Sequence, residues 1–173
     1  EETLSDNELL LPDLSASCSE SSCGEDTYFC DGTTKVWQNY YCENSCTYSI
    51  IPLYFSQECG YASPGFAPDG SPLVVITETE IDEGLLTNEF IEFTALQPLE
   101  LSNFSLYQNG VLLATFPTPY ILDGSAKVYT GNGTNTTTTV FLNQETTLWN
   151  TPGAVAILVN PQGETVATQS FED

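Results

Sequence analysis

Acidic residues form the densest group of chemically active side chains outside the N-terminal stretch. Glu78, Glu80, Asp82 and Glu83 fall within one short segment, and two carboxyl groups held close together can hydrolyse a glycosidic bond. The chain contains no His, which removes the Ser-His and Cys-His pairs that activate nucleophiles. With 24 Asp and Glu in 173 residues, such a cluster is expected by chance. We therefore expect a protein that is not an enzyme, with a divergent hydrolase as an alternative.

The same four carboxylates could instead coordinate Ca²⁺, a hard cation that takes several oxygen ligands. The chain lacks the D-x-D-x-D-G pattern of an EF-hand loop. A solvated acidic loop is the favoured interpretation of the segment, and Ca²⁺ is the one candidate cofactor.

Six cysteines lie in the first third of the chain, and none follows. An even number of clustered cysteines predicts three disulfides formed in an oxidising compartment. A zinc module is the alternative, but the chain has no His and no C-x-x-C pair. The sequence does not choose among the possible pairings of Cys18, Cys23, Cys30, Cys42, Cys46 and Cys59.

The ends and hydropathy of the chain indicate where it resides. The sequence begins at Glu1, contains no Met and has no run of roughly 18 apolar residues. We expect a signal peptide to have been removed, an extracellular or cell-surface location, and no insertion into a membrane.

Charge narrows the range of partners. The net charge is -22, the only basic residues are Lys35 and Lys127, and the acids divide 12 and 12 between residues 1–72 and 73–173. Such a surface repels nucleic acid and anionic lipid. Cations, glycans or another copy of the chain are the expected partners, and solubility in a salty or hot habitat is the alternative reason for the charge.

The N-terminal arm, residues 1–17, is acidic apart from its leucines. It is too short and too polar to bury them by itself. We expect it to add as a strand to the sheet of a neighbouring subunit, or alternatively to fold back on its own disulfide module. The leucines are Leu4, Leu9, Leu10, Leu11 and Leu14.

Residues 18–62 are predicted to form a small disulfide-rich β module. Strand-forming residues at 27–30 and 35–42 flank the turn dipeptide Asp31-Gly32, which indicates a hairpin. An aromatic cluster would supply the small core, and sugar binding is its alternative role. Its members are Trp37, Tyr40, Tyr41 and Tyr48. Residues 63–72 are rich in Pro and Gly and are predicted to form a linker.

Residues 73–173 are predicted to form an all-β sandwich. Short alternating or β-branched runs recur with turn residues between them, and no helical periodicity is present. Asn109-Gly110 predicts a hairpin turn and Pro161-Gln162-Gly163 a second. The predicted strands cover 73–81, 89–96, 104–116, 127–131, 138–143 and 154–171.

Five motifs follow one another in this region: Val75-Ile76-Thr77-Glu78; Glu89-Phe90-Ile91-Glu92-Phe93; Glu100 to Leu106; Leu122 and Gly124 with Val128-Tyr129-Thr130-Gly131-Asn132-Gly133; and Leu148-Trp149-Asn150 with Gly153. In this order they resemble the lamin tail domain, an immunoglobulin-like sandwich of nuclear lamins and of many secreted bacterial and archaeal proteins. Phe104 stands where that family usually has Trp, and Ala154 where it has Asp. The resemblance covers residues 73–171. The resemblance implies a structural role for the residues that match the family's motifs. Trp149 and Phe104 would lie in the core, and Gly131, Gly133 and Gly153 would allow turns.

Three sequons offer candidate N-glycosylation sites. Asn132 and Asn135 lie in the polar loop GNGTNTTTT, where a glycan can stand in solvent. Asn103 lies between Leu101 and Phe104, which we expect to be packed.

Two functions fit these expectations. The first is a structural subunit of an extracellular filament or surface assembly that polymerises through its N-terminal arm. The alternative is a secreted, non-catalytic module for adhesion or for binding glycan or protein.

Overall fold

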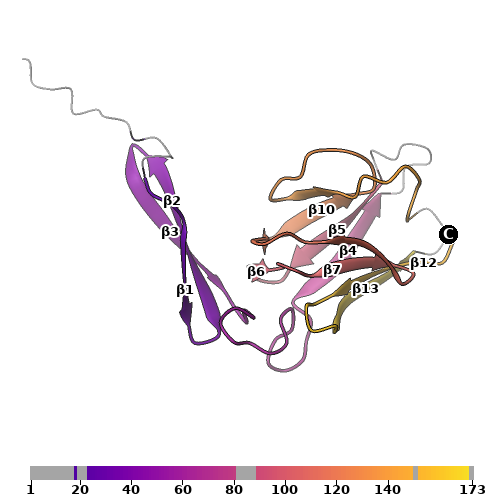
Figure 1. Cartoon of the computed structure of the whole chain (residues 1–173), viewed down its shortest axis with the longest axis horizontal. Helices are drawn as coiled ribbons and strands as arrows, with labels where there is room; N and C mark the ends of the chain where they lie inside the picture. Colours follow the sequence, from indigo (N-terminus) through magenta and orange to yellow (C-terminus); the bar gives the residue numbers. More distant parts are fainter. Residues whose placement is uncertain (1–17, 19–22, 81–88, 150–151, 172–173) are drawn as a thin grey trace, which may run out of the picture.

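The computed structural model describes residue 18 and the ranges 23–80, 89–149 and 152–171. Within these ranges the chain forms thirteen β-strands and no helix, so the predicted all-β fold class is confirmed. Figure 1 shows an elongated sheet near the N-terminus beside a sandwich that includes the C-terminal strands. Consequently, no helix in the described part of the chain is long and apolar enough to cross a bilayer.

The disulfide module is one antiparallel sheet of strand order β1-β2-β3, formed by β1 (Thr27–Asp31), β2 (Thr34–Glu43) and β3 (Ser45–Leu53). Gly32 turns β1 into β2 with φ of 59°, which confirms the hairpin predicted there. Asn44 turns β2 into β3 with φ of 67°. The sequence analysis had not identified β3, whose Pro52 fits an edge strand.

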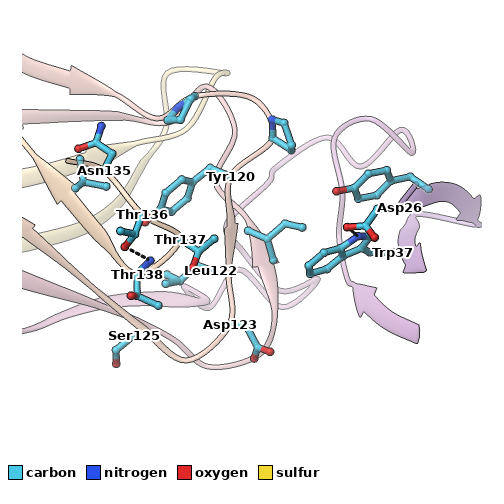
Figure 2. Close-up of a pocket in the computed structure, with 15 residues that line it drawn as sticks. Asp26, Trp37, Tyr120, Leu122, Asp123, Ser125, Asn135, Thr136, Thr137 and Thr138 are labelled. Atoms are coloured by element: carbon cyan, nitrogen blue, oxygen red, sulfur yellow. Dashed lines mark hydrogen bonds between the residues drawn. The ribbon is translucent and has the colours of Figure 1, made fainter. Parts of the chain in front are cut away.

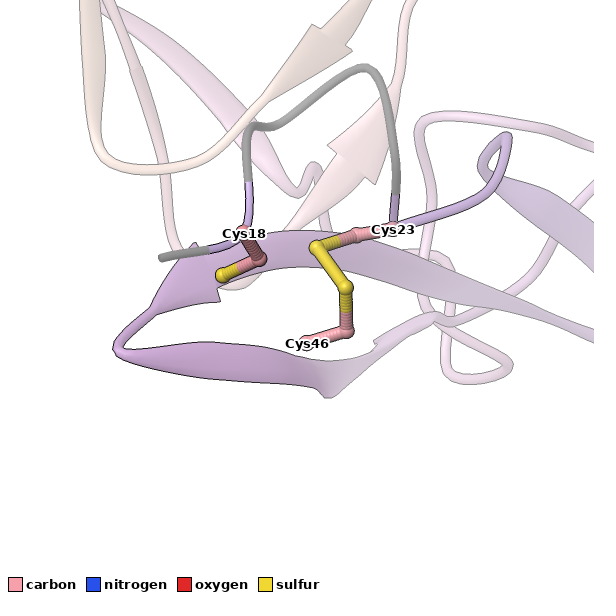
Figure 3. A group of neighbouring side chains, drawn as sticks. All are labelled: Cys18, Cys23 and Cys46. Carbon is pink, nitrogen blue, oxygen red and sulfur yellow. A yellow bond between two sulfur atoms is a disulfide. The ribbon is translucent and has the colours of Figure 1, made fainter. Parts of the chain in front are cut away.

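The three predicted disulfides are present as Cys18–Cys42, Cys23–Cys46 and Cys30–Cys59. Cys42 and Cys46 face each other at the end of the β2–β3 hairpin, so two disulfides tie the preceding segment to this tip. Figure 3 shows Cys23 joined to Cys46 beside Cys18. The sulfur atoms of these three residues lie within 4.8 Å of one another, but all are bonded in disulfides and none is a thiolate able to bind zinc.

The aromatic residues of the module do not form a buried core, and that expectation was wrong. Tyr48 is 53% exposed, and Trp37, Tyr40 and Tyr41 are half-buried. The physical reason is that a single sheet has no second layer to cover its faces in the described part of the chain. The module therefore depends on its disulfides for stability more than on apolar burial.

Two four-stranded sheets packed face to face make up the sandwich. The first has the order β11-β10-β5-β4, with β4 (Val74–Glu80), β5 (Phe90–Ala95), β10 (Ser125–Tyr129) and β11 (Thr139–Phe141). The second has the order β13-β12-β7-β8, with β7 (Ser105–Gln108), β8 (Val111–Thr115), β12 (Ala154–Val159) and β13 (Thr165–Phe171). Strands β6 (Leu99–Glu100) and β9 (Ile121–Leu122) form a short separate pair.

The core lies between the two sheets. Trp149 and Phe104 are each 1% exposed within it, as the sequence analysis predicted. Strand β12 shows the alternation that builds this core, since Ala154, Ala156 and Leu158 are buried whereas the residues between them are half-exposed.

The predicted turns hold the sheets in register. Asn109 and Gly110 both have positive φ, 47° and 82°, and join β7 to β8 with the geometry that Asn-Gly favours. The turn between β12 and β13 is confirmed as well, and the Asn160 side chain accepts hydrogen bonds there from the backbone N–H groups of Gln162 and Glu164.

The segment predicted as a linker packs along the sandwich. Pro64 and Gly65 are buried, and the Pro64 carbonyl accepts a hydrogen bond of 2.9 Å from Asn160 Nδ2. Gly65 also accepts from the N–H of Leu73 at 2.8 Å. These contacts hold the connection between the two bodies against the sandwich.

Candidate functional site

The sheet β13-β12-β7-β8 carries no charged side chain in any of its four strands. On a chain with a net charge of -22 this is the feature that most distinguishes one sheet from the other. Across its outer face, Ile157, Tyr107 and Leu112 are aligned on adjacent strands. We call these four strands the uncharged sheet.

Strand β8 is the edge of the uncharged sheet that exposes apolar side chains. It pairs with β7 on one side and has no strand on the other in the described ranges. Val111 is 64% exposed and Leu112 is 53% exposed. A register shift leaves Leu113 without a partner on β7, so the regular part of this edge is short.

The leucines of the N-terminal arm, Leu4, Leu9, Leu10, Leu11 and Leu14, lie outside the described residues. The structure nevertheless fixes where the arm joins the folded chain, because the Cys18–Cys42 disulfide attaches residue 18 to the tip of the β2–β3 hairpin. The nine residues of β3 lead from this tip toward the sandwich, a distance of about 30 Å. Figure 1 shows that the tip is the end of the module away from the sandwich.

A cleft of about 600 Å³ lies between the module and the sandwich. Figure 2 shows the side chains of the two bodies on opposite sides of it. The module contributes two aromatic residues and Asp26, and the sandwich contributes residues from 117–125 and from the Thr-rich loop at 135–138. No basic residue lines the cleft among the residues that the structure describes.

Tyr28 and Trp37 form the module's wall of this cleft. They are cross-strand neighbours on β1 and β2, and their rings are nearly parallel, with centroids 6.2 Å apart and an interplanar angle of 11°. Asp26 fixes the position of Trp37, because Asp26 Oδ2 accepts a hydrogen bond of 3.1 Å from Trp37 Nε1. The other carboxylate oxygen accepts from the backbone N–H of Tyr40 at 3.0 Å.

Tyr120 forms part of the opposite wall. Its side chain is 6% exposed, and its hydroxyl has no hydrogen-bond partner among the described residues. Burial raises the pKa of Tyr120 above its ordinary value of 10.0, so the hydroxyl is protonated at neutral pH. A buried hydroxyl without a partner costs free energy, which makes Tyr120 a notable feature of this wall.

Lys35 connects the two bodies. Its Nζ atom lies 2.7 Å from Glu58 Oε2 and 3.0 Å from Glu100 Oε1, and Glu100 belongs to the sandwich strand β6. Burial acts to lower the pKa of Lys35, but hydrogen bonds to Glu58 and Glu100 outweigh it and raise the pKa above 10.5. Lys35 also lies 4.5 Å from the centre of the Tyr28 ring. One charged side chain therefore links the aromatic wall to the sandwich.

All three candidate glycosylation sites are exposed. Asn103 has φ of 63° and lies between buried Leu101 and Phe104. Asn132 lies outside the cleft lining, whereas Asn135 lines the cleft. Asn135 Oδ1 accepts a hydrogen bond of 2.8 Å from the backbone N–H of Phe141, which orients the side chain through the atom that would not carry a glycan.

The candidate calcium ligands are only partly described. Glu78 and Glu80 belong to β4, where their backbones pair with Glu92 and Phe90. Asp82 and Glu83 lie outside the described residues. The side chains of the proposed ligand set therefore lie outside the described part of the structure, and Ca²⁺ binding there stays a prediction.

Sequence reasoning missed the cleft and one buried carboxylate, Glu89, which is 0% exposed. Its Oε1 and Oε2 atoms accept hydrogen bonds from the backbone N–H groups of Trp149 and Leu148 at 2.8 and 2.9 Å. The Thr130 hydroxyl also donates to Oε2. The signal for it in the sequence was its position directly before the apolar strand β5. Because acidic residues are rarely buried, this position alone did not place Glu89 in the core.

The chain matches no known protein family and no curated protein sequence. The resemblance of residues 73–171 to the lamin tail domain therefore stays a prediction.

Proposed function

We propose that this chain is a structural subunit of an extracellular assembly, in which the N-terminal arm of one copy adds to the β8 edge of the uncharged sheet of the next. The observation that carries the proposal is the exposure of Val111 and Leu112 on an open, charge-free edge. An exposed apolar edge strand is a template for pairing with another chain.

Electrostatics favours this surface as the contact. Two chains of net charge -22 repel each other, and this repulsion is strongest where acidic groups approach within the Debye length of about 8 Å at physiological salt. A contact on the uncharged sheet brings no acidic strand residues together. The leucine tripeptide at 9–11 supplies the apolar side chains that Val111 and Leu112 would cover.

The point of attachment of the arm places it where it can reach a neighbouring subunit. Residue 18 is bonded to the far tip of the module, and an arm of 17 residues can span at most about 60 Å. A donor at one end and an acceptor at the other end of the same molecule give a head-to-tail contact. When successive copies do not close into a ring, such a contact produces a filament.

Secretion and the lack of catalysis belong to the same proposal. Three disulfides support an oxidising environment outside the cytosol. The absence of His from the sequence supports a non-catalytic role.

Deletion of residues 1–14 tests the proposal, because it removes all five leucines of the arm and leaves every cysteine in place. We expect the truncated chain to fold, with three disulfides by mass spectrometry, and to stay monomeric in light scattering and electron microscopy under conditions in which the full chain forms fibres. Fibres formed by the truncated chain would refute the proposal.

A further inference from the structure

We propose that the cleft between the module and the sandwich is a binding site for a neutral saccharide. This inference is independent of the assembly proposed above, because it uses neither the arm nor the uncharged sheet. Its volume of about 600 Å³ is within the range of about 300 to 1,000 Å³ typical of small-molecule sites.

The aromatic wall provides the surface on which a sugar ring packs. The apolar C–H face of a pyranose lies against flat aromatic rings, and Tyr28 and Trp37 present two nearly parallel rings to the cleft. The Trp37 ring is fixed by its hydrogen bond to Asp26 and the Tyr28 ring by Lys35. Because both rings are already held in place, little side-chain entropy is lost when a ligand binds.

The opposite wall provides polar groups for sugar hydroxyls. Tyr120 contributes its ring to this wall, whereas its hydroxyl oxygen is buried away from solvent. The remaining polar lining is rich in side-chain hydroxyl groups, with one carboxylate at its margin: Ser125, Thr136, Thr137, Thr138 and Asp123. Figure 2 shows these residues on the sandwich side of the cleft, with Trp37 and Asp26 on the module side.

Charge selects a neutral ligand. The cleft is lined by Asp26 and Asp123 and by no Lys in the part of the chain that the structure describes, and the whole chain has a net charge of -22. An anionic ligand would be repelled, whereas the hydroxyl groups of a neutral saccharide donate hydrogen bonds to carboxylate and hydroxyl oxygens.

The saccharide can come from two sources. Asn135 lines the cleft and is the first residue of the sequon Asn135-Thr136-Thr137, so a glycan attached there would begin inside the site. A glycan of another molecule would enter from solvent. Asn132, in the same loop but outside the lining, provides the matched control for the first source.

Tryptophan fluorescence measures ligand binding at the cleft directly, because only one of the two tryptophans of the chain lies there. Trp149 is 1% exposed, whereas Trp37 is half-buried at the cleft, so quenching of fluorescence by the neutral quencher acrylamide reports mainly on Trp37. Asn135→Gln protein would be titrated with cellotriose, maltotriose, mannotriose and chitotriose, and with trigalacturonate as an anionic control of similar size. We expect at least one neutral trisaccharide, and not trigalacturonate, to protect Trp37 from acrylamide.

Tyr28→Ala removes one ring of the aromatic wall. Tyr28 lines the cleft and is 38% exposed, so this change should weaken saccharide affinity by about three- to tenfold, the value of one aromatic contact. Tyr48→Ala, which removes an exposed aromatic side chain on the other face of the module, leaves affinity unchanged.

The glycosylated protein identifies the source. If the glycan on Asn135 fills the cleft, Trp37 is protected from acrylamide in the native protein and in Asn132→Gln but exposed in Asn135→Gln. If the ligand comes from elsewhere, the native protein and Asn135→Gln bind the trisaccharides equally. The proposal is overturned if no neutral trisaccharide and no Asn135 glycan protects Trp37, or if Tyr28→Ala binds as the parent protein does.

Discussion

Glu89 Oε1 accepts a hydrogen bond of 2.8 Å from the backbone N–H of Trp149, across 60 residues of sequence. The carboxylate is fully buried, and its other oxygen accepts from the neighbouring N–H of Leu148. A buried carboxyl group is tolerated when several hydrogen-bond donors surround it. This contact ties β5 to the loop that places Trp149 in the core.

Replacement of Glu89 tests the importance of this contact. Glu89→Ala leaves two buried N–H groups and the Thr130 hydroxyl without their acceptor, at a cost of about 1 to 3 kcal/mol each. We expect the free energy of unfolding to fall by at least about 3 kcal/mol, measured by guanidinium denaturation followed through tryptophan fluorescence. Glu92, which is half-buried in the strand β5 that follows Glu89, is the control, and Glu92→Gln changes stability by less than about 0.5 kcal/mol. Equal stability of both variants would contradict the assignment.

Loss of the Lys35 ammonium group loosens the attachment of the module to the sandwich. Lys35→Gln leaves Glu100, whose side chain is 8% exposed, without its cation, and removing one partner of a buried pair costs about 3 kcal/mol. Small-angle X-ray scattering should show a larger maximum dimension for this variant. Lys127→Gln removes the other Lys, which lies over the Phe90 ring, and should leave the scattering curve unchanged. Identical curves for the two variants would contradict the role of Lys35.

The same ion pair predicts a dependence on alkaline pH. The pKa of Lys35 is raised above 10.5 in the folded chain, so its contribution to stability is complete below pH 10.5 and is lost as the pH rises through the raised value. The parent protein should show this loss of stability in denaturation curves taken across that interval, and Lys35→Gln should not. A loss of the same size in both proteins would show that another group is responsible.

A like charge on β8 should prevent assembly. Leu112 and Ile50 are similarly exposed, 53% and 56%, and lie on the sandwich and on the module respectively. Leu112→Glu places a carboxylate at the proposed contact between subunits and should abolish fibres in electron microscopy, whereas Ile50→Glu changes net charge equally and should form them. Fibres from Leu112→Glu, with none from Ile50→Glu, would move the contact to the module.

The sequence predicted the features that local chemistry determines. Asn109-Gly110 and Asp31-Gly32 formed the expected turns because each supplies a residue that accepts positive φ. Three disulfides were expected from the cysteine count, but their pairing depended on how β2 and β3 align Cys42 with Cys46.

The cleft and the buried Glu89 could not be predicted in the same way. Trp37 and Tyr120 come from different bodies, and nothing in the spacing of the two residues indicates that they face one cavity. The aromatic cluster of the module was assigned to a core because composition does not reveal whether a second layer covers a sheet. Tyr48 is exposed for that reason.

The position of the two distal disulfides determines how the molecule carries tension. A pull on residue 18 passes through the bond to Cys42 directly into β2, and the bond from Cys23 to Cys46 loads β3 at the same level. The hydrogen bonds between β1 and β2 are outside this path. Mechanical load therefore passes through covalent links from residue 18 to the base of the hairpin. A reducing agent should lower the force needed to unfold the module, even if the shape of the protein without load does not change.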